Sequence, residues 1–370
     1  MPNQEFILDD HIIHLNHAAV APWPKRTVEA VKKFAEENAH IGSQRYLAWI
    51  KTETRLREQL RSMLNAKSTD EIALLKSTSE ALSVVAYGLD WSSGDEIVIP
   101  YQEFPSNRIV WESLKRFGVN IIQVDLMSAD SPEQALINAM TDKTKLLSVS
   151  SVQYATGLKI HLESLGLACK DRDILFCIDA IQSLGAFPLD VQTCHADFVM
   201  ADGHKWMLGP EGLAVFYCRQ ALIDKLQLNQ FGWHMIQAVG EFDQIEWQAA
   251  DNARRFECGS PNTLGIHALH ASLELILETG IDTIAARILE NTSVILDNLP
   301  DRVQCLSPIE SQRRSGIVTL LPIDADLEKC YERLQKNNVL CALRGGGIRF
   351  SPHYYTGERE ILRAVGLLIV

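Results

Sequence analysis

The segment Asp179–Gly212, DAIQSLGAFPLDVQTCHADFVMADGHKWMLGPEG, decides the fold of this chain. One short apolar run, residues 175–178 (LFCI), leads into Asp179, and a second within the segment, residues 198–201 (FVMA), leads into the sequence DGHK, which ends at Lys205. Apolar runs of this length, bounded by polar residues, are typical of buried parallel strands. Because side chains just beyond such strands line the crevice where open α/β sheets bind ligands, we expect Asp179 and Lys205 to share one cleft.

A lysine and a carboxylate in one cleft are the pair that pyridoxal 5′-phosphate (PLP) chemistry requires. The lysine amine forms a Schiff base with the cofactor aldehyde, and the carboxylate keeps the pyridine nitrogen protonated so that the ring can accept electrons. For an isolated pair, a salt-bridged aspartate beside a surface lysine would be the commoner outcome. Gly203, Gly209 and Gly212 favour the cofactor, because glycines near Lys205 would allow close backbone approach to a ligand. We therefore predict Lys205 and Asp179 as catalytic residues.

These residues resemble the class V aminotransferase family of fold-type I PLP enzymes, which includes cysteine desulfurases, kynureninase and isopenicillin N epimerase. The sequence DAIQ, from Asp179 to Gln182, resembles the D-x-x-Q element of the family, and the sequence ending at Lys205 resembles its G-H-K. The resemblance extends from residues 15–19 (LNHAA) to about Arg349. It implies an α/β fold with a mostly parallel, seven-stranded-type sheet, helices on both faces and a smaller α+β domain.

The length and the residue pattern agree with two domains. A chain of 370 residues with 46% hydrophobic residues exceeds the usual size of one domain. We expect an N-terminal segment over residues 1–25, a large PLP-binding domain over 26–265 and a small domain over 266–370. The expected strands lie near residues 72–75, 96–100, 120–124, 145–149, 213–218, 316–321, 339–343 and 347–350. The expected helices begin near Pro24 and lie over residues 44–64, 81–89, 131–140, 263–280, 282–299 and 326–337. Alternating strands and helices favour a parallel sheet.

The composition excludes several classes of partner. A formal net charge of −12 argues against nucleic acid or an anionic membrane surface as a partner. No run approaches the ~18 apolar residues of a membrane span, and the beginning MPNQEFILDD lacks a signal-peptide pattern. Eight cysteines without C-x-x-C spacing suggest reduced thiols in a cytoplasmic protein that has no metal site.

The sequence Ser77-Thr78-Ser79-Glu80 opens a predicted helix. On its own it reads as an ordinary N-cap, although a helix N-terminus of this kind can also hold a phosphate. The resemblance implies that Thr78 and Ser79 bind the cofactor phosphate. It also implies that Ser260 reaches the phosphate of a neighbouring subunit, in a homodimer with a shared active site. A local turn before the next helix would explain Ser260 equally well.

The resemblance assigns four further residues to the cofactor. Phe104 matches a histidine that stacks on the cofactor ring in desulfurases; it can stack but cannot transfer protons, which counts against the desulfurase reaction. Tyr154 and Gln182 are implied to support the ring oxygen, and His204 the phosphate or the ring face. Asp202 stands where desulfurases carry serine, and its role is left open.

Arg349 matches the arginine of the family that binds the substrate α-carboxylate, a task suited to its planar donors. Asn16 and His17 are weaker candidates for substrate contact, because His17 could simply cap a turn. In desulfurases a longer loop before this arginine carries the attacking cysteine. Here four residues separate Arg344 from Arg349, none of them a cysteine, and Cys341 lies in an apolar run.

We predict a PLP-dependent enzyme that acts on a small amino acid, favouring an aminotransferase. A C–S lyase or an amino-acid epimerase without the cysteine loop is the alternative, because all three reactions begin with loss of the α-proton. A catalytically silent binding protein with the same fold is disfavoured by the intact Asp179, Gln182 and Lys205. A dinucleotide-binding protein is disfavoured because no G-x-G-x-x-G follows the early strands.

Overall fold

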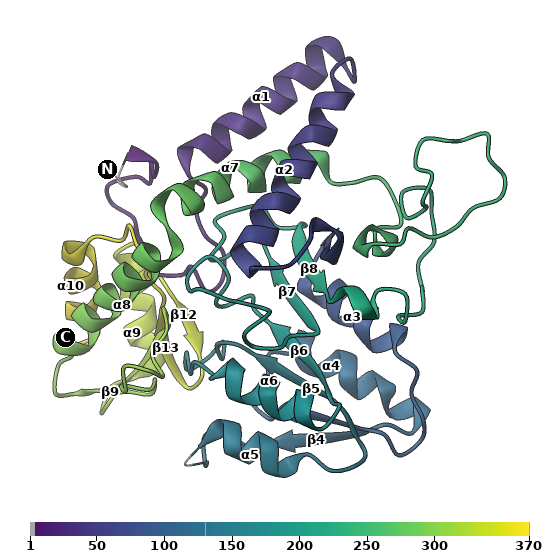
Figure 1. Cartoon of the computed structure of the whole chain (residues 1–370). Coiled ribbons are helices and arrows are strands. Elements are labelled where there is room, and N and C mark those ends of the chain that lie inside the picture. The colour runs from purple at the N-terminus through teal and green to yellow at the C-terminus, as the bar shows by residue number, and fades with distance from the viewer. Residues whose placement is uncertain (1–3, 130, 370) are drawn as a thin grey trace.

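The computed structural model describes residues 4–129 and 131–369, which form a large domain and a smaller one (Figure 1). In the described large domain, seven strands form one sheet in the order β2-β8-β7-β6-β5-β3-β4. Strand β8 is antiparallel to both β2 and β7, and the remaining neighbours are parallel. The strands are β2 Ile72–Leu75, β3 Glu96–Pro100, β4 Asn120–Val124, β5 Thr144–Ser150, β6 Leu175–Asp179, β7 Phe198–Asp202 and β8 Ala214–Cys218. The expected mostly parallel sheet is therefore confirmed.

The sheet is buried on both faces, which explains the unbroken apolar runs that predicted its strands. Successive side chains of a strand point to opposite faces. In β7, Val199 and Ala201 belong to one hydrophobic core, whereas Phe198 and Met200 belong to a second core on the other face. The helices of this part are α1 Lys25–Ile41, α2 Tyr46–Leu64, α3 Thr78–Gly88, α4 Ser106–Glu112, α5 Pro132–Ala139, α6 Leu162–Asp171 and α7 Thr263–Thr279. Helix α7 packs along α1 and α2 at the top of the view in Figure 1.

The smaller domain has its own sheet, in the order β12-β13-β10-β9, and its own hydrophobic core. Its strands are β9 Val303–Cys305, β10 Val318–Pro322, β12 Ala342–Arg344 and β13 Gly347–Phe350, and its helices are α8 Ile281–Asp297, α9 Leu327–Lys336 and α10 Glu358–Gly366. None of the helices in the described part of the chain is long and apolar enough to cross a membrane.

One expected strand of the smaller domain is divided in two. The sequence predicts a single strand over residues 339–343, but β11 (Val339–Leu340) ends before Cys341 and β12 begins after it. The reason is a change of partner: β11 pairs in parallel with β1 (Ile13–His14), whereas β12 pairs with β13. The N-terminal segment is thereby attached to the smaller domain, an arrangement that the sequence pattern did not predict.

Candidate active site

Asp179 and Lys205 lie at the carboxyl ends of two neighbouring parallel strands, β6 and β7. Asp179 is 2% exposed, and its carboxylate accepts a hydrogen bond of 3.0 Å from the backbone N–H of Ile181. Burial raises the pKa of Asp179 to about 6. Burial lowers the pKa of Lys205 to about 8, although the nearby charge of Asp179 acts in the opposite direction. Each of the two charges acts on the pKa of the other group, so the side chains lie close enough to interact at the ends of neighbouring strands.

Two aromatic side chains adjoin the lysine. The Nζ atom of Lys205 lies 5.7 Å from the centre of the Phe104 ring, and this ring meets Tyr154 edge to face at 5.1 Å. Phe104 follows β3 and Tyr154 follows β5, so four strand ends supply Phe104, Tyr154, Asp179 and Lys205. An aromatic face beside an amine and a carboxylate is a suitable environment for a planar heteroaromatic ring.

The glycines around Lys205 have a different explanation from the one inferred from the sequence. A Cβ atom added to Gly209 would lie 2.6 Å from Cδ1 of Leu269 in α7, and one added to Gly203 would lie 3.2 Å from the same atom. Gly212 has a φ of +80°. Tight packing of α7 and backbone conformation account for these glycines, so their presence does not by itself indicate a ligand.

The N-terminus of α3 carries the predicted phosphate ligands. Ser77 caps the helix by accepting from the N–H of Glu80. The backbone N–H of Thr78 donates to the carboxylate of Asp202 at 3.2 Å, and the N–H of Asp202 donates to the Thr78 hydroxyl at 3.1 Å. Asp202 therefore occupies one donor that a phosphate would use. Burial raises the pKa of Asp202 to about 6.

The other predicted cofactor ligands differ in how many of their hydrogen-bonding atoms are free. These residues are Ser79, His204 and Gln182. The hydroxyl of Ser79 donates to Ser106 at 2.8 Å near the helix start. The buried Nδ1 of His204 has no hydrogen-bond partner among the described residues, and burial lowers the pKa of His204 to about 4. Gln182 is largely committed to the protein: its amide donates to the Ala18 carbonyl and accepts from the Trp206 indole N–H. One amide N–H of Gln182 is left for a ligand.

Arg349 is the best-placed candidate for an anion. It is 3% exposed, and Nη1 donates to the backbone carbonyl of Tyr154 at 2.7 Å. Its buried Nε has no partner within residues 4–129 and 131–369. Burial, and to a smaller extent the charge of Arg344, lowers the pKa of Arg349 to about 10. A buried guanidinium with an unused donor indicates a binding site for an anionic group.

Asn16 and His17 have different surroundings. Asn16 forms a β-bridge with Ser351, two residues beyond Arg349, and its buried Oδ1 has no hydrogen-bond partner in the described part of the chain. His17 is completely buried, with one ring nitrogen 2.9 Å from the Ser351 carbonyl and the other 2.6 Å from the Tyr355 hydroxyl. Because both nitrogens of His17 are engaged, it presents no free ring nitrogen to a substrate.

Ser260 lies apart from the other candidates and is exposed. It lines a hollow of about 300 Å³ together with Lys76 and Glu80, which flank the start of α3. Near it, the long segment between β8 and α7 protrudes at the upper right of Figure 1. Within this segment Phe231, Phe242 and Trp247 are 63%, 78% and 53% exposed.

Sequence reasoning missed a buried carboxylate in the cleft, that of Glu103. It accepts hydrogen bonds from the backbone N–H and the hydroxyl of Ser150, at 2.6 Å and 2.5 Å. Ser150 is the register partner of Asp179 in the β5–β6 pair. Burial raises the pKa of Glu103 to about 7, and the charge of Asp179 contributes to the rise. The available signal was an acidic residue directly before Phe104, at the end of a buried strand.

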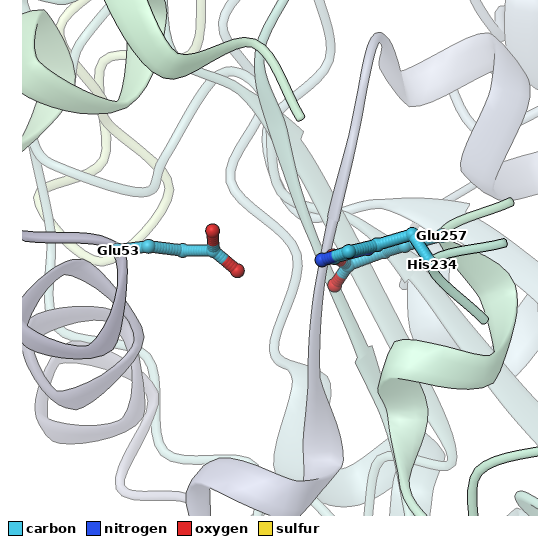
Figure 2. Close-up of side chains that lie close together, drawn as sticks. All are labelled: Glu53, His234 and Glu257. Carbon is cyan, nitrogen blue, oxygen red and sulfur yellow. The ribbon is translucent and has the colours of Figure 1, made fainter. Parts of the chain in front are cut away.

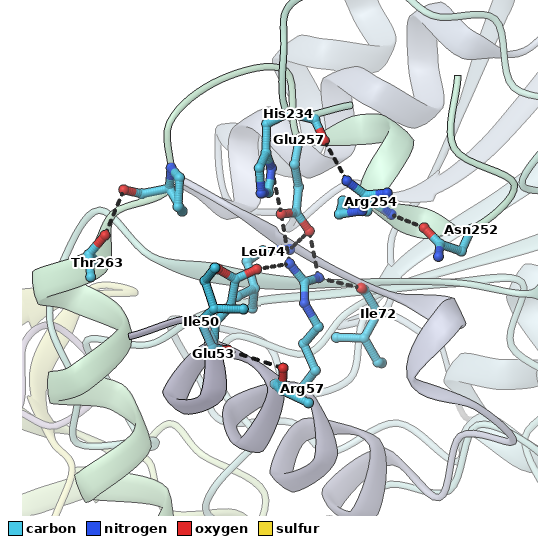
Figure 3. A network of polar contacts seen from close by, with 12 residues as sticks. Ile50, Glu53, Arg57, Ile72, Leu74, His234, Asn252, Arg254, Glu257 and Thr263 are labelled. Atoms are coloured by element: carbon cyan, nitrogen blue, oxygen red, sulfur yellow. Dashed lines mark hydrogen bonds and ion pairs between the residues drawn. The ribbon is translucent and has the colours of Figure 1, made fainter. Parts of the chain in front are cut away.

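A second buried cluster of charges joins α2 to the segment between β8 and α7. Glu53, His234 and Glu257 bring potential metal ligands within 4.8 Å of one another (Figure 2). However, Arg57 donates to Glu53 at 2.6 Å and to both oxygens of Glu257 at 2.6 Å and 2.8 Å (Figure 3). Because one guanidinium already binds both carboxylates, we interpret this cluster as a structural ion-pair network, named here the Arg57 network. It consists of Glu53, Arg57, His234 and Glu257.

Comparison with known proteins gives the same family over nearly the whole chain. The family described as Aminotransferase class-V matches residues 13–361. A probable cysteine desulfurase of Methanothermobacter thermautotrophicus is 28% identical over 96% of this chain and 93% of its own length. An uncharacterized aminotransferase of Bacillus subtilis is 27% identical over 80% of this chain and 78% of its own length.

Solved structures share the fold. A cysteine desulfurase of Thermococcus onnurineus superimposes with a TM-score of 0.86 at 24% identity, covering 97% of this chain and 94% of that one. A cystine C–S lyase, solved with cysteine persulfide, gives a TM-score of 0.89 at 22% identity and covers 97% of each chain. The family match confirms the expected cofactor, pyridoxal 5′-phosphate, and the structural likeness confirms the fold class.

Proposed function

Because this chain belongs to the class V aminotransferase family of PLP-dependent enzymes, we propose that it is an aminotransferase that acts on an amino acid in the Lys205 cleft. When bound, the cofactor supplies an aldehyde and an electron-accepting ring. The observation that carries the proposal is a set of three buried charged groups: the amine of Lys205, the carboxylate of Asp179 and the guanidinium of Arg349, whose Nε has no hydrogen-bond partner among the described residues.

Lys205 would bond covalently to the cofactor aldehyde and later act as a base. Burial lowers its pKa from 10.5 to about 8, so far more of the amine is unprotonated near neutral pH than in an ordinary lysine. An unprotonated amine is both the nucleophile and the acceptor for the α-proton of a substrate. Because Lys205 adjoins the Phe104 ring, a planar group resting on Phe104 would lie within its reach.

Asp179 and the start of α3 would hold opposite ends of the cofactor. The buried Asp179 carboxylate would keep a proton on the pyridine nitrogen. Thr78 and Ser79 would bind the phosphate at the helix N-terminus, and His204 could add its free Nδ1. Asp202 would have to share the Thr78 N–H with that phosphate, and it can do so without charge repulsion when protonated.

The substrate would be oriented by Arg349. Its buried Nε is available to a carboxylate, and a planar pair of guanidinium donors matches the two oxygens of that group. The unpaired Oδ1 of Asn16, beside Ser351, could accept from the substrate amine. Tyr154 would flank the bound ring through the edge of its phenol.

A homodimer with a shared active site is part of the proposal. The exposed Ser260 and the exposed aromatic side chains of the protruding segment support it, because contiguous apolar surface of this kind usually marks an interface. If Ser260 reaches the cofactor of the partner subunit, Ser260→Ala should weaken cofactor retention without preventing dimer formation. Unchanged cofactor affinity in this variant would contradict the shared site.

A C–S lyase is the second candidate, favoured by the relatives named cysteine desulfurase. The structure constrains how such a reaction could proceed. Strands β12 and β13 are joined by Gly345 and Gly346 alone, with φ of +59° and +81°, as in a tight two-residue hairpin. No loop exists there to carry an attacking thiol, so any C–S cleavage would occur directly at the cofactor.

The deciding experiment is a single-turnover reaction of the holoenzyme with individual amino acids. An aminotransferase should convert its cofactor to pyridoxamine phosphate and release the matching 2-oxo acid. Release of pyruvate and ammonia, together with sulfide from cysteine or cysteine persulfide from cystine and with the cofactor unchanged, would instead establish the lyase. Racemisation without either product would establish an epimerase.

A further inference from the structure

Two arginines project from the same face of the small-domain sheet. In the antiparallel β12–β13 pair, Arg344 is opposite Gly347 and Ala342 is opposite Arg349. Opposed residues share a face, and so do residues two apart on one strand. Arg344 and Arg349 are therefore diagonal neighbours, whose Cβ atoms lie roughly 7–8 Å apart in an ordinary sheet.

This face is the one that meets the active-site cleft. The opposed pair Leu343 and Ile348 points the other way, into the core of the smaller domain, where Ile348 is completely buried. On the face of the two arginines, Arg349 donates to the Tyr154 carbonyl and its neighbour Thr319 donates to the Ala155 carbonyl at 2.5 Å. Arg344 lies on this same face, at an exposed position of β12.

Arg344 has no carboxylate to balance it. Among the ion pairs of the described residues none includes Arg344, and the hydrogen bond recorded for its side chain is from Nη1 to the carbonyl of Leu343 at 2.8 Å. By contrast, Arg108 in the same cleft pairs with Glu112 at 2.8 Å. The charge of Arg344 contributes to the lowered pKa of Arg349, as expected for two cations at close range without an anion between them.

The space beside the two arginines can hold a polar side chain. A cleft of about 700 Å³ is lined by Tyr154 and by Gly345, which adjoins Arg344. Its two carboxylates already have partners, since Glu112 pairs with Arg108 and Glu103 accepts from Ser150. Neither of these carboxylates forms an ion pair with Arg344.

We propose that Arg344 binds an anionic group on the side chain of the substrate, while Arg349 binds the α-carboxylate. The substrate class is then a short dicarboxylic amino acid such as aspartate or glutamate. The guanidinium fork matches a carboxylate better than a lone amine would. This inference rests on the proposed function, because it requires an amino-acid substrate held at Arg349.

The test compares acidic amino acids with their neutral isosteres in the holoenzyme. Single-turnover kcat/KM should be higher for aspartate and glutamate than for asparagine and glutamine. Arg344→Gln should lower the acidic values roughly tenfold to a hundredfold, because a hydrogen bond to a charged group is lost, and should leave the neutral values unchanged. Arg302→Gln, at an exposed position of the same domain, is the matched control and should change neither.

A binding measurement separates this inference from the proposed reaction. By calorimetry, succinate should bind the holoenzyme more tightly than butyrate, and Arg344→Gln should remove that difference. If no amino acid is converted but succinate retains its Arg344-dependent advantage, the proposed function fails and the anion site stands. A wild-type preference for neutral amino acids, or an equal loss for acidic and neutral ones in Arg344→Gln, would overturn the inference.

Discussion

The active-site cleft and the Arg57 network are both buried clusters of charge, but they satisfy their charges differently. In the Arg57 network, Glu257 accepts from Arg57 and from the N–H of Leu74, and Arg57 also donates to the carbonyl of Ile72. These bonds join α2, β2 and the segment before α7 (Figure 3). Burial lowers the pKa of Arg57, but the charges of Glu257 and Glu53 outweigh it and raise that pKa above its ordinary value.

The active-site cleft shows the opposite pattern. Burial moves the pKa of Asp179 upward and that of Lys205 downward, toward the neutral form of each group. The buried Nε of Arg349 and Nδ1 of His204 have no partners among the described residues. Buried polar groups are normally bonded, so unsatisfied ones at a cleft indicate where a ligand completes the set. Among the described residues of the Arg57 network, one buried atom, Nδ1 of His234, also has no hydrogen-bond partner. It lies 3.6 Å from the carboxylate of Glu257.

Loss of the active-site lysine should have the largest effect. Lys205→Ala should lower turnover by roughly 10³-fold or more, because both the covalent attachment and the base are removed. Borohydride treatment of the wild-type holoenzyme should leave the cofactor attached to the peptide that contains Lys205, as mass spectrometry would show. Lys159→Ala is the control, because burial lowers the pKa of Lys159 as it lowers that of Lys205, although Lys159 is only half-buried. Equal activity of the two variants would refute the assignment.

Loss of the central arginine of the Arg57 network should lower the unfolding free energy of the protein and not act on the catalytic groups. Arg57→Ala leaves the carboxylates of Glu53 and Glu257 buried without a cation, which typically costs about 3–5 kcal/mol of unfolding free energy. Urea denaturation would measure this. Arg287→Ala removes the exposed Arg287–Glu290 pair and should cost no more than about 1 kcal/mol. Similar losses in both variants would show that the Arg57 network is not a stabilising element.

A change in the active site should instead stabilise the protein while abolishing activity. The folded-state pKa of Asp179, about 6, exceeds its ordinary value of 3.8, so ionised Asp179 disfavours the folded state. Asp179→Asn should therefore raise the unfolding free energy of the cofactor-free protein by roughly 1–3 kcal/mol at pH 8. The gain should shrink as pH falls through 6 and vanish below about pH 4. A pH-independent gain would mean that packing, and not charge, is responsible.

The fold was predictable because its strands are buried on both faces. The runs ending at Asp179 and Ala201 carry a pattern that few other structures produce, and they place Asp179 and Lys205 at one sheet edge. The division of residues 339–343 at Cys341 was not predictable, since it depends on pairing with a segment more than 300 residues earlier. Local pattern identifies a strand but does not identify its partner.

The site was predictable where the family motif is local and not where the contacts are distant. Lys205 and Asp179 follow from short motifs, whereas the Arg57–Glu257 contact joins residues 200 positions apart. Likewise, the sequence indicates a carboxylate at Glu103 but not its burial against Ser150. The glycines near Lys205 show the same limit of local sequence, because their contact with Leu269 of α7 could not be read from the motif.

The smallest effect is expected at Cys341, which tests whether this protein uses a thiol as the relatives named cysteine desulfurase would suggest. Cys341 is 4% exposed in the core of the smaller domain, and burial raises the pKa of its thiol to about 12. A thiol that stays protonated in a core is a poor nucleophile. Cys341→Ala should therefore leave turnover with every amino acid unchanged, and mass spectrometry after incubation with cysteine should detect no persulfide on this residue. Cys258→Ala, at a more accessible thiol, is the control for non-specific sulfur adducts. If Cys341→Ala alone abolished sulfur transfer, the buried thiol would have to become exposed during the reaction, and the tight β12–β13 hairpin could not be the resting structure of a working enzyme.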